Sequence, residues 1–231
     1  MRLNQSRVLK NLSRYSTNMR CVVDTVLLHQ ICQYFLPRNI LEIGFFQGQT
    51  LGIIAEAVEF DSDFVAVDKE FGNNKIFKVL FPELETKVRY IQDDSNNVVY
   101  HENFDFVCID GDHRYSYVKQ DVKTVLPCLK KDSVLYMDDI NTPDVVQVIH
   151  EDLLGSHDMV PFLKGDQGMF FHRVDHNASD FLMHLMSSKY NKFMSFTNIN
   201  FSGHTILNVS AMPVFQDSHN IFCSALSFYD L

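Results

Sequence analysis

The sequence predicts an α/β fold, in which a mostly parallel sheet is covered by helices on both faces. Two observations support this prediction. Short apolar segments of strand length alternate with segments of helical periodicity, and polar clusters follow the strands at their carboxyl ends. Strands that alternate with helices imply βαβ crossovers. We therefore expect a doubly wound, Rossmann-like sheet of seven strands with an antiparallel closing strand, followed by a C-terminal extension.

The first half of the chain alternates regularly. A helix is expected over 19–37, where apolar residues recur at helical spacing and Pro37 stops the pattern. After this helix, strands are expected at 39–44, 63–68 and 87–92, and helices at 49–60 and 73–81.

The second half continues the alternation and then closes the sheet. Pro143 stands in the first turn of one expected helix, a position that suits proline. Segments 159–164 and 168–174 read as an antiparallel pair. The remaining expected elements are strands at 104–109 and 133–137 and helices at 115–129, 143–154 and 181–190.

Three regions follow from this pattern. Residues 1–17 are expected to form an arm, 18–175 the Rossmann-like domain, and 176–231 an extension packed on the core or in an oligomer contact. A homo-oligomer is therefore one expected state. The first twenty residues hold five basic residues and no acid, which is also typical of an organelle transit peptide, whereas a mobile arm or a flap near the site is the other interpretation.

Composition excludes several classes of function. A net charge of −9 over 231 residues argues against nucleic acid as the main partner, and no apolar run approaches the roughly 20 residues that span a bilayer. The five cysteines show no CxxC spacing and predict neither a disulfide framework nor a zinc site. We therefore expect a protein of a reducing compartment, the cytoplasm, with no membrane partner.

The loop after the first strand carries Glu42, Gly44 and Gly48 in "LEIGFFQGQT". It lacks the close glycine pair of the dinucleotide fingerprint G-x-G-x-x-G, so the loop forms a poorer binding site for a pyrophosphate at the helix N-terminus. Gly44 would let the chain turn without a Cβ, and Gly48 would admit a ligand close to the backbone. The acid at Glu42 suits a cationic group better than a phosphate.

Acids also follow the next two strands. Asp68 ends the second strand, where a carboxylate can hold a ribose diol, and Asp94 with Ser95 follows the third, where they could face an adenine edge. Because loops of α/β proteins are generally polar, any one of these residues alone carries little weight. The series of three acids is more specific.

These motifs, followed by "FDFVCIDGDHRYSYVKQDVKTVLPCLKKDSVLYMDDI", resemble the successive motifs of class I S-adenosylmethionine-dependent methyltransferases over roughly residues 35–145. The last stretch resembles the branch of macrocin-type sugar O-methyltransferases. The resemblance implies that the methionine end of the cofactor lies by Glu42 and Gly44, its ribose by Asp68, and its adenine by Asp94 and Ser95. Gly48 and Asp110 complete the expected cofactor-binding set.

The resemblance also implies a metal site. Asp110 ends the fourth strand, and Asp138 and Asp139 end the fifth, which is its neighbour in the family's sheet. Three carboxylates suit a hard divalent cation, most plausibly Mg²⁺. The alternative is that Asp138 or Asp139 caps the helix at Pro143.

His113 is the expected catalytic residue, because the branch uses a histidine three residues beyond this aspartate as general base. An imidazole that titrates near neutrality can take a hydroxyl proton. Without this context, a histidine after a strand would more often be a surface or structural residue. Asp112 is expected either to orient His113 or to cap the helix that starts near Arg114.

The sequence thus predicts a transferase: a Mg-assisted, S-adenosylmethionine-dependent O-methyltransferase acting on a hydroxyl of a small polar acceptor, with a sugar as one candidate. A catechol-like acceptor or an amine stays open within the same chemistry. Two other classes are a nicotinamide-dependent Rossmann oxidoreductase and a non-catalytic methyltransferase-like binding module. The missing glycine pair counts against the first, and the intact acids count against the second.

Overall fold

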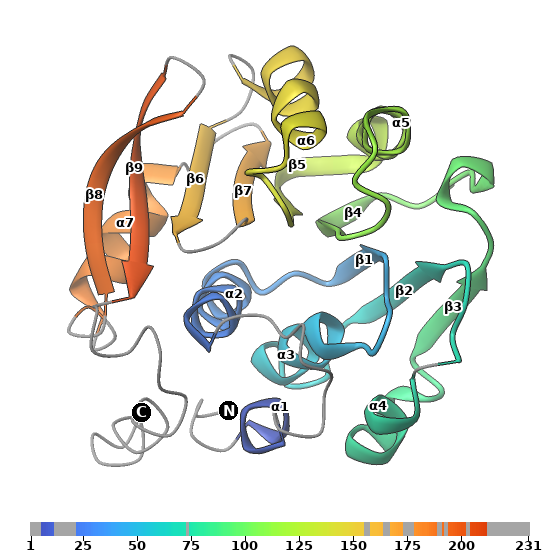
Figure 1. Ribbon diagram of the computed structural model, residues 1–231. Helices are drawn as coiled ribbons and strands as arrows, with labels where there is room; N and C mark the ends of the chain where they lie inside the picture. The colour runs from blue at the N-terminus through green and yellow to red at the C-terminus, as the bar shows by residue number, and fades with distance from the viewer. Residues whose placement is uncertain are drawn as a thin grey trace.

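The computed structural model describes residues 6–11, 22–72, 74–154, 158–163, 167–172, 178–188, 191, 194–201 and 204–211. These residues form a nine-stranded sheet in the order β3-β2-β1-β4-β5-β7-β6-β9-β8. Helices lie on both sides of the sheet (Figure 1). Most of the predicted arm and the last twenty residues lie outside the described residues, so the division into arm, domain and extension stays a prediction.

Five strands form the parallel part of the sheet, and the direction of winding reverses between β1 and β4. This reversal is the topological switch point, where open α/β sheets bind ligands at the carboxyl ends of their strands. The α/β, Rossmann-like prediction is confirmed here. The strands are β1 (Asn39–Ile43), β2 (Asp63–Asp68), β3 (Val88–Gln92), β4 (Phe104–Ile109) and β5 (Leu129–Met137).

The register aligns the ends of the three central strands. Ile43 pairs with Ile109 and Ile109 pairs with Met137. The residues that follow stay side by side, because the Asp110 amide donates to the Ile43 carbonyl at 2.8 Å and the Asp138 amide donates to the Ile109 carbonyl at 3.0 Å. The polar clusters after β1, β4 and β5 therefore meet at one edge of the sheet.

Four more strands extend the sheet beyond β5. β7 runs antiparallel to β5, β6 antiparallel to β7, β9 parallel to β6, and β8 antiparallel to β9. The prediction of seven strands is wrong, because the Asn- and Ser-rich C-terminal segment adds two strands to the same sheet. These four strands are β6 (Asp158–Leu163), β7 (Gln167–His172), β8 (Met194–Phe201) and β9 (His204–Ala211).

The helices cover both faces, as expected for a doubly wound sheet. α2 and α3 lie on one side and α5 and α6 on the other (Figure 1). A short 3₁₀ turn, η4 (Ser95–Asn97), follows β3. The helices are α1 (Arg7–Lys10), α2 (Val22–Phe35), α3 (Gln49–Ala57), α4 (Lys75–Leu80), α5 (Tyr115–Val125), α6 (Pro143–Val148) and α7 (Ala178–Ser187).

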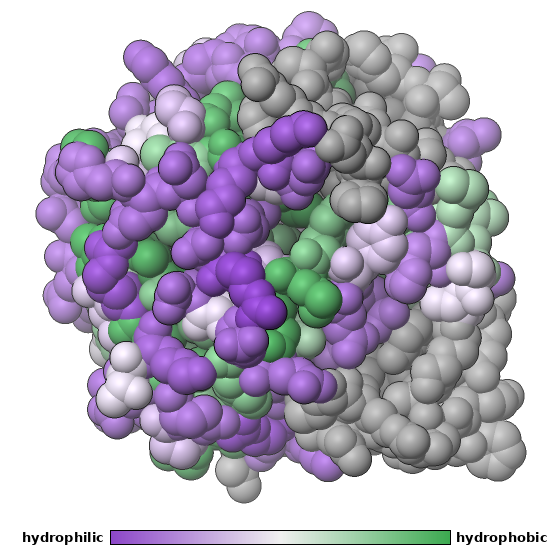
Figure 2. Space-filling view, turned by 180° about the vertical axis from the view of Figure 1, so that it is seen from behind, coloured by the Kyte–Doolittle hydropathy of each residue, from purple (hydrophilic) through white to green (hydrophobic). Residues whose placement is uncertain are grey.

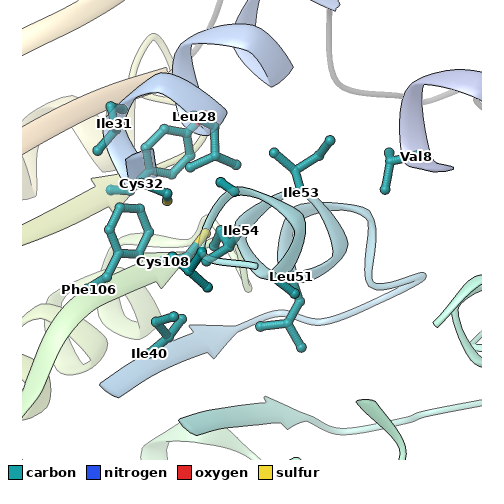
Figure 3. Close-up of a cluster of buried hydrophobic side chains, with 14 of the residues drawn as sticks. Val8, Leu28, Ile31, Cys32, Ile40, Leu51, Ile53, Ile54, Phe106 and Cys108 are labelled. Carbon is teal, nitrogen blue, oxygen red and sulfur yellow. The ribbon is translucent and has the colours of Figure 1, made fainter. Parts of the chain in front are cut away.

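Alternate residues of the strands divide between two hydrophobic cores. Ile40 of β1 and Phe106 of β4 face α2 and α3, and Figure 3 shows them in one cluster with Ile31 of α2 and Ile54 of α3. The next residues along these strands, such as Leu41, face α5 and α6. Burial of both faces explains why the parallel strands are almost continuously apolar.

The described part of the N-terminal arm is docked on α3. The Ser6 hydroxyl and the Arg7 amide both donate to the Glu56 carboxylate, the amide at 2.6 Å. The Arg7 guanidinium lies over the Phe60 and Phe81 rings, 4.9 and 4.6 Å from their centroids. Burial raises the pKa of Glu56, and these donors oppose that rise.

The coloured part of the face shown in Figure 2 is mainly hydrophilic. Seen from behind in Figure 2, hydrophobic residues form small, separate patches among hydrophilic ones. Within the described part of the chain, no helix combines the length and the apolar character needed to cross a membrane.

Candidate active site

A cavity of about 310 Å³ opens at the carboxyl ends of β1, β2, β3 and β4, at the switch point of the sheet. Four of the predicted site residues line it: Gly44, Asp68, Ser95 and Asp110. The other lining residues are Ile43, Phe46, Val67, Lys69, Asp93, Gly111, Asp112 and Tyr117.

Gly44 lets the first loop pass against the loop after β4. Its φ is +88°, and a Cβ at this position would lie 1.9 Å from the Asp110 carbonyl oxygen, so no other residue fits without rearrangement. Gly48 does not line the cavity. It adopts φ +72° at the start of α3, where a Cβ would meet the Phe45 and Phe77 rings.

Asp68 is fixed at the end of β2 by two backbone donors. Its carboxylate accepts from the Phe46 amide at 2.7 Å and from the Glu70 amide at 3.0 Å. A carboxylate has about four lone-pair sites, so these bonds leave capacity for a diol. Glu42 lies on β1, is buried and is not among the lining residues, so the structure does not bring it into the cavity.

The loop after β3 forms the cavity wall nearest to β2. Asp94 caps η4 by accepting from the Asn96 amide at 3.1 Å, and it pairs with Lys69 at 3.0 Å. Asp93 and Ser95 line the cavity, whereas Asp94 does not. Of the two residues predicted to face adenine, Ser95 therefore lines the cavity and Asp94 does not, and the neighbouring Asp93, which the sequence did not single out, lines it as well.

Tyr117 is a lining residue that sequence reasoning left unassigned. The Lys69 ammonium lies 4.6 Å and the Arg114 guanidinium 4.5 Å from the centroid of its ring. Arg114 also donates hydrogen bonds to both carboxylate oxygens of Asp112, and this lowers the pKa of Asp112 to about 2. No sequence signal shows that one aromatic ring meets two cations from different loops.

His113 lies between two of the predicted carboxylates. Its Nδ1 is 2.5 Å from Oδ2 of Asp139, and its Nε2 is 3.8 Å from Oδ1 of Asp110. Asp110 contributes most to raising the pKa of His113, and the charges of Asp139 and Asp138 add to it against the opposing effect of partial burial. Asp139 fixes Nδ1, whereas Nε2 is buried and faces Asp110, and His113 is not one of the residues that line the cavity.

The three carboxylates have the chemistry of a Mg²⁺ site, since oxygen donors suit a hard cation. Their arrangement does not fit one: Asp139 is engaged by His113, and Asp138 accepts from the Asp139 amide at 3.1 Å. Across the described ranges, no group of three His, Cys, Asp or Glu side chains is arranged to hold a metal ion. Metal binding at Asp110, Asp138 and Asp139 stays a prediction.

Comparison with known proteins finds similarity over the part of the chain that forms the cavity. Residues 41–140 match the family model described as a methyltransferase domain. The matched range runs from β1 to the end of β5 and so includes every loop that lines the cavity. No curated protein matches the chain.

Solved structures of methyltransferases share the fold of this domain. A putative caffeoyl-CoA O-methyltransferase from Staphylococcus aureus has a TM-score of 0.59 at 16% identity, covering 73% of this chain and 92% of its own. TomG, an O-methyltransferase of tomaymycin synthesis from Streptomyces achromogenes solved with S-adenosylmethionine, has a TM-score of 0.54 at 18% identity, with coverages of 73% and 87%.

A third relative was solved with bound S-adenosylhomocysteine. The Podospora anserina methyltransferase PaMTH1 has a TM-score of 0.59 at 13% identity, covering 76% of this chain and 89% of its own. At such identities, structural likeness establishes the fold. Together with the methyltransferase-domain match, it supports an S-adenosylmethionine-dependent methyltransferase enzyme.

Proposed function

We propose that this protein transfers a methyl group from S-adenosylmethionine to a hydroxyl of a small polar acceptor. The observation that carries the proposal is His113, which is held against Asp139 and lies 3.8 Å from Asp110, a residue that lines the cavity. A sugar is the proposed acceptor class, on the basis of the macrocin-type resemblance of residues 104–140.

The cavity offers a contact for each part of the cofactor. The carboxylate of Asp68 suits the ribose hydroxyls, and the polar groups of Asp93 and Ser95 suit the adenine edge. At the other end, Gly44 and Asp110 leave room and negative charge for the cationic methionine portion. This division supports S-adenosylmethionine over a dinucleotide, whose pyrophosphate would meet carboxylates here.

His113 is the proposed general base. Bound S-adenosylmethionine supplies an electrophilic methyl group on a sulfonium sulfur. This step requires the acceptor to reach Nε2 of His113, which is buried in this structure. Nε2 then accepts the hydroxyl proton as the acceptor oxygen bonds to the methyl carbon, and the electron pair of the broken C–S bond stays on sulfur. Asp139 stabilises the imidazolium through Nδ1, and the protein otherwise contributes alignment of the reacting atoms.

Magnesium remains a separate proposal, and no step above depends on it. Cation binding by Asp110, Asp138 and Asp139 would require Asp139 to release His113. Titration calorimetry with Mg²⁺ on wild-type protein and on Asp138→Asn tests this: heat of binding that is lost in the variant supports the site, and equal traces reject it.

Cytoplasmic location, a homo-oligomeric state and the absence of nucleic-acid and membrane partners are also proposals. They rest on the acidic composition, the cysteine pattern and the C-terminal segment. Light scattering of the purified full chain tests the oligomeric state directly.

The test of the proposed function is methyl transfer to a panel of sugars, catechols and amines. His113→Ala should lower turnover on the true acceptor by roughly 10²- to 10⁴-fold, which is the usual contribution of a general base. His101→Ala is the matched control, because His101 is exposed and does not line the cavity. Full turnover by His113→Ala would reject the base assignment.

A further inference from the structure

Asp121 occupies a position of α5 that an apolar residue would ordinarily fill. The buried face of this helix consists of Val118, Asp121, Val122 and Val125. Asp121 is only 2% exposed, so its carboxylate lies inside the protein rather than in solvent. Neither the predicted site nor the proposed mechanism uses it.

The Asp121 carboxylate lies directly behind the cavity wall. A Cβ on Gly111 would be 3.8 Å from Oδ2 of Asp121, and α5 packs against η4, which begins at Ser95. Gly111 and Ser95 both line the cavity. Asp121 therefore sits behind the wall that faces the adenosine part of the cofactor.

This carboxylate is costly to bury. Within the described residues, neither of its oxygens has a hydrogen-bond partner of good geometry. The Ser95 hydroxyl approaches closely enough to oppose the rise in the pKa of Asp121 that burial causes. The charges around it from neighbouring loops are Asp94 and Asp112, which oppose ionisation, and Lys69, which favours it. A buried acid with so little compensation calls for a role other than packing.

We propose that Asp121 is a positioning residue that fixes the Ser95 hydroxyl as a hydrogen-bond acceptor for the amino group of the adenine ring. This inference rests on the proposed function, because it concerns the cofactor of that same site. It assigns Asp121 to nucleobase selection rather than to methyl transfer.

The chemistry of the two groups gives the selectivity. An ionised carboxylate can only accept hydrogen bonds, so a Ser95 hydroxyl that turns to Asp121 donates its one proton there. Its oxygen then faces the cavity as an acceptor. Adenine presents an amino donor at C6, whereas hypoxanthine presents a carbonyl acceptor, which would be left unpaired against the Ser95 oxygen.

The test compares S-adenosylhomocysteine with S-inosylhomocysteine, which differ at C6 of the base, by titration calorimetry on the full chain. Wild-type protein should prefer the adenine compound about tenfold or more, as expected when one hydrogen bond is replaced by an unpaired acceptor. Ser95→Ala should reduce this preference to about twofold. Asp121→Asn should reduce it in part, because an amide can accept from or donate to the Ser95 hydroxyl and so no longer fixes its direction, and the double variant should fall no further than Ser95→Ala. Ser95→Thr retains the hydroxyl and should retain the preference.

Gln120→Ala is the control on the same helix, because Gln120 bonds to Thr124 and does not line the cavity. With saturating acceptor and varied S-adenosylmethionine, Asp121→Asn should raise the KM for the cofactor and leave kcat within about twofold, since no reacting atom is touched. Ser95→Ala, in a surface turn, supplies the same readout if Asp121→Asn does not fold.

Two results would overturn the inference. Either Asp121→Asn and Ser95→Ala keep the full preference, or they weaken both compounds equally, which would indicate a structural role alone. If wild-type protein binds neither compound, the proposed function fails together with this inference. Wild-type binding with an unchanged preference in both variants rejects the role of Asp121 alone.

Discussion

The buried Asp121 carboxylate should make the protein less stable than it would be with a neutral side chain there. Burial raises the pKa of Asp121 from its ordinary 3.8 to about 6. Because each pKa unit corresponds to about 1.4 kcal/mol, this difference costs the folded state about 3 kcal/mol once the group is ionised. Asp121→Asn is nearly isosteric and removes the ionisation.

The sign of the pH dependence follows from this shift. Below pH 3.8 the carboxyl is protonated in both the folded and unfolded states, so ionisation costs nothing. As pH rises toward 6, the unfolded chain ionises first, and the folded state loses stability relative to it. The advantage of Asp121→Asn from this source should therefore rise from about 1 kcal/mol at pH 4.5 to about 3 kcal/mol at pH 7.5.

The assay is urea unfolding followed by circular dichroism at pH 4.5, 6.0 and 7.5. The difference between wild type and variant is the useful quantity, because the other titrating groups cancel in it and the fixed cost of burying an amide does not vary with pH. Asp63→Asn, exposed at the start of β2, is the control. A difference that stays constant across this range would refute the reasoning.

Four further predictions follow. Gly44→Ala should lower the free energy of unfolding by at least ~2 kcal/mol, because a Cβ would collide with the Asp110 carbonyl at φ +88°. Gly72→Ala should not, because a Cβ there would make only an ordinary contact with the Glu70 side chain at 3.7 Å; urea unfolding measures both. Ser6→Ala should cost about 1 to 3 kcal/mol by the same assay, because it removes a donor from the buried Glu56 carboxylate, and an unchanged unfolding midpoint would argue against docking of the arm. The reaction requires the neutral form of His113, and the neighbouring carboxylates raise the pKa of this residue. The acid limb of the kcat/KM–pH profile should therefore lie above pH 6.5 and should move to lower pH in Asp139→Asn. An acid limb that does not move would contradict the pairing of His113 with Asp139. EDTA treatment followed by Mg²⁺ addition should leave turnover unchanged if His113 and Asp139 act as arranged here, and a loss restored by Mg²⁺ would support the metal site instead.

The regular part of the fold could be predicted because burial on two faces leaves a simple pattern. Strands β1 to β4 were placed within one residue of their bounds at either end. The helices α3 and α4 were expected at the right places but are shorter than predicted, since α3 ends at Ala57 and α4 spans Lys75–Leu80. β5 begins at Leu129 rather than at Ser133, because the polar stretch between them continues the strand at its exposed end. β8 and β9 were not placed in the sheet, since local composition does not show which strand a segment will pair with.

The candidate site was predictable only in part, for a similar reason. Asp68, Ser95 and Asp110 follow strand ends, so the sequence pattern places them at the cavity. Tyr117 reaches the cavity from the first turns of α5, where an aromatic residue more often packs. Asp121 did leave a signal: an acid three residues after Val118 and one before Val122, on the apolar side of the helix.

The most direct test of the central claim is calorimetric titration of S-adenosylhomocysteine into the full chain and into two variants of β2. Asp68→Ala alters the cavity end of this strand, and Asp63→Ala alters its other end. The account predicts one bound ligand per chain in wild type and in Asp63→Ala, with affinity strongly reduced in Asp68→Ala. No binding to wild type, or equal binding to all three proteins, would contradict it.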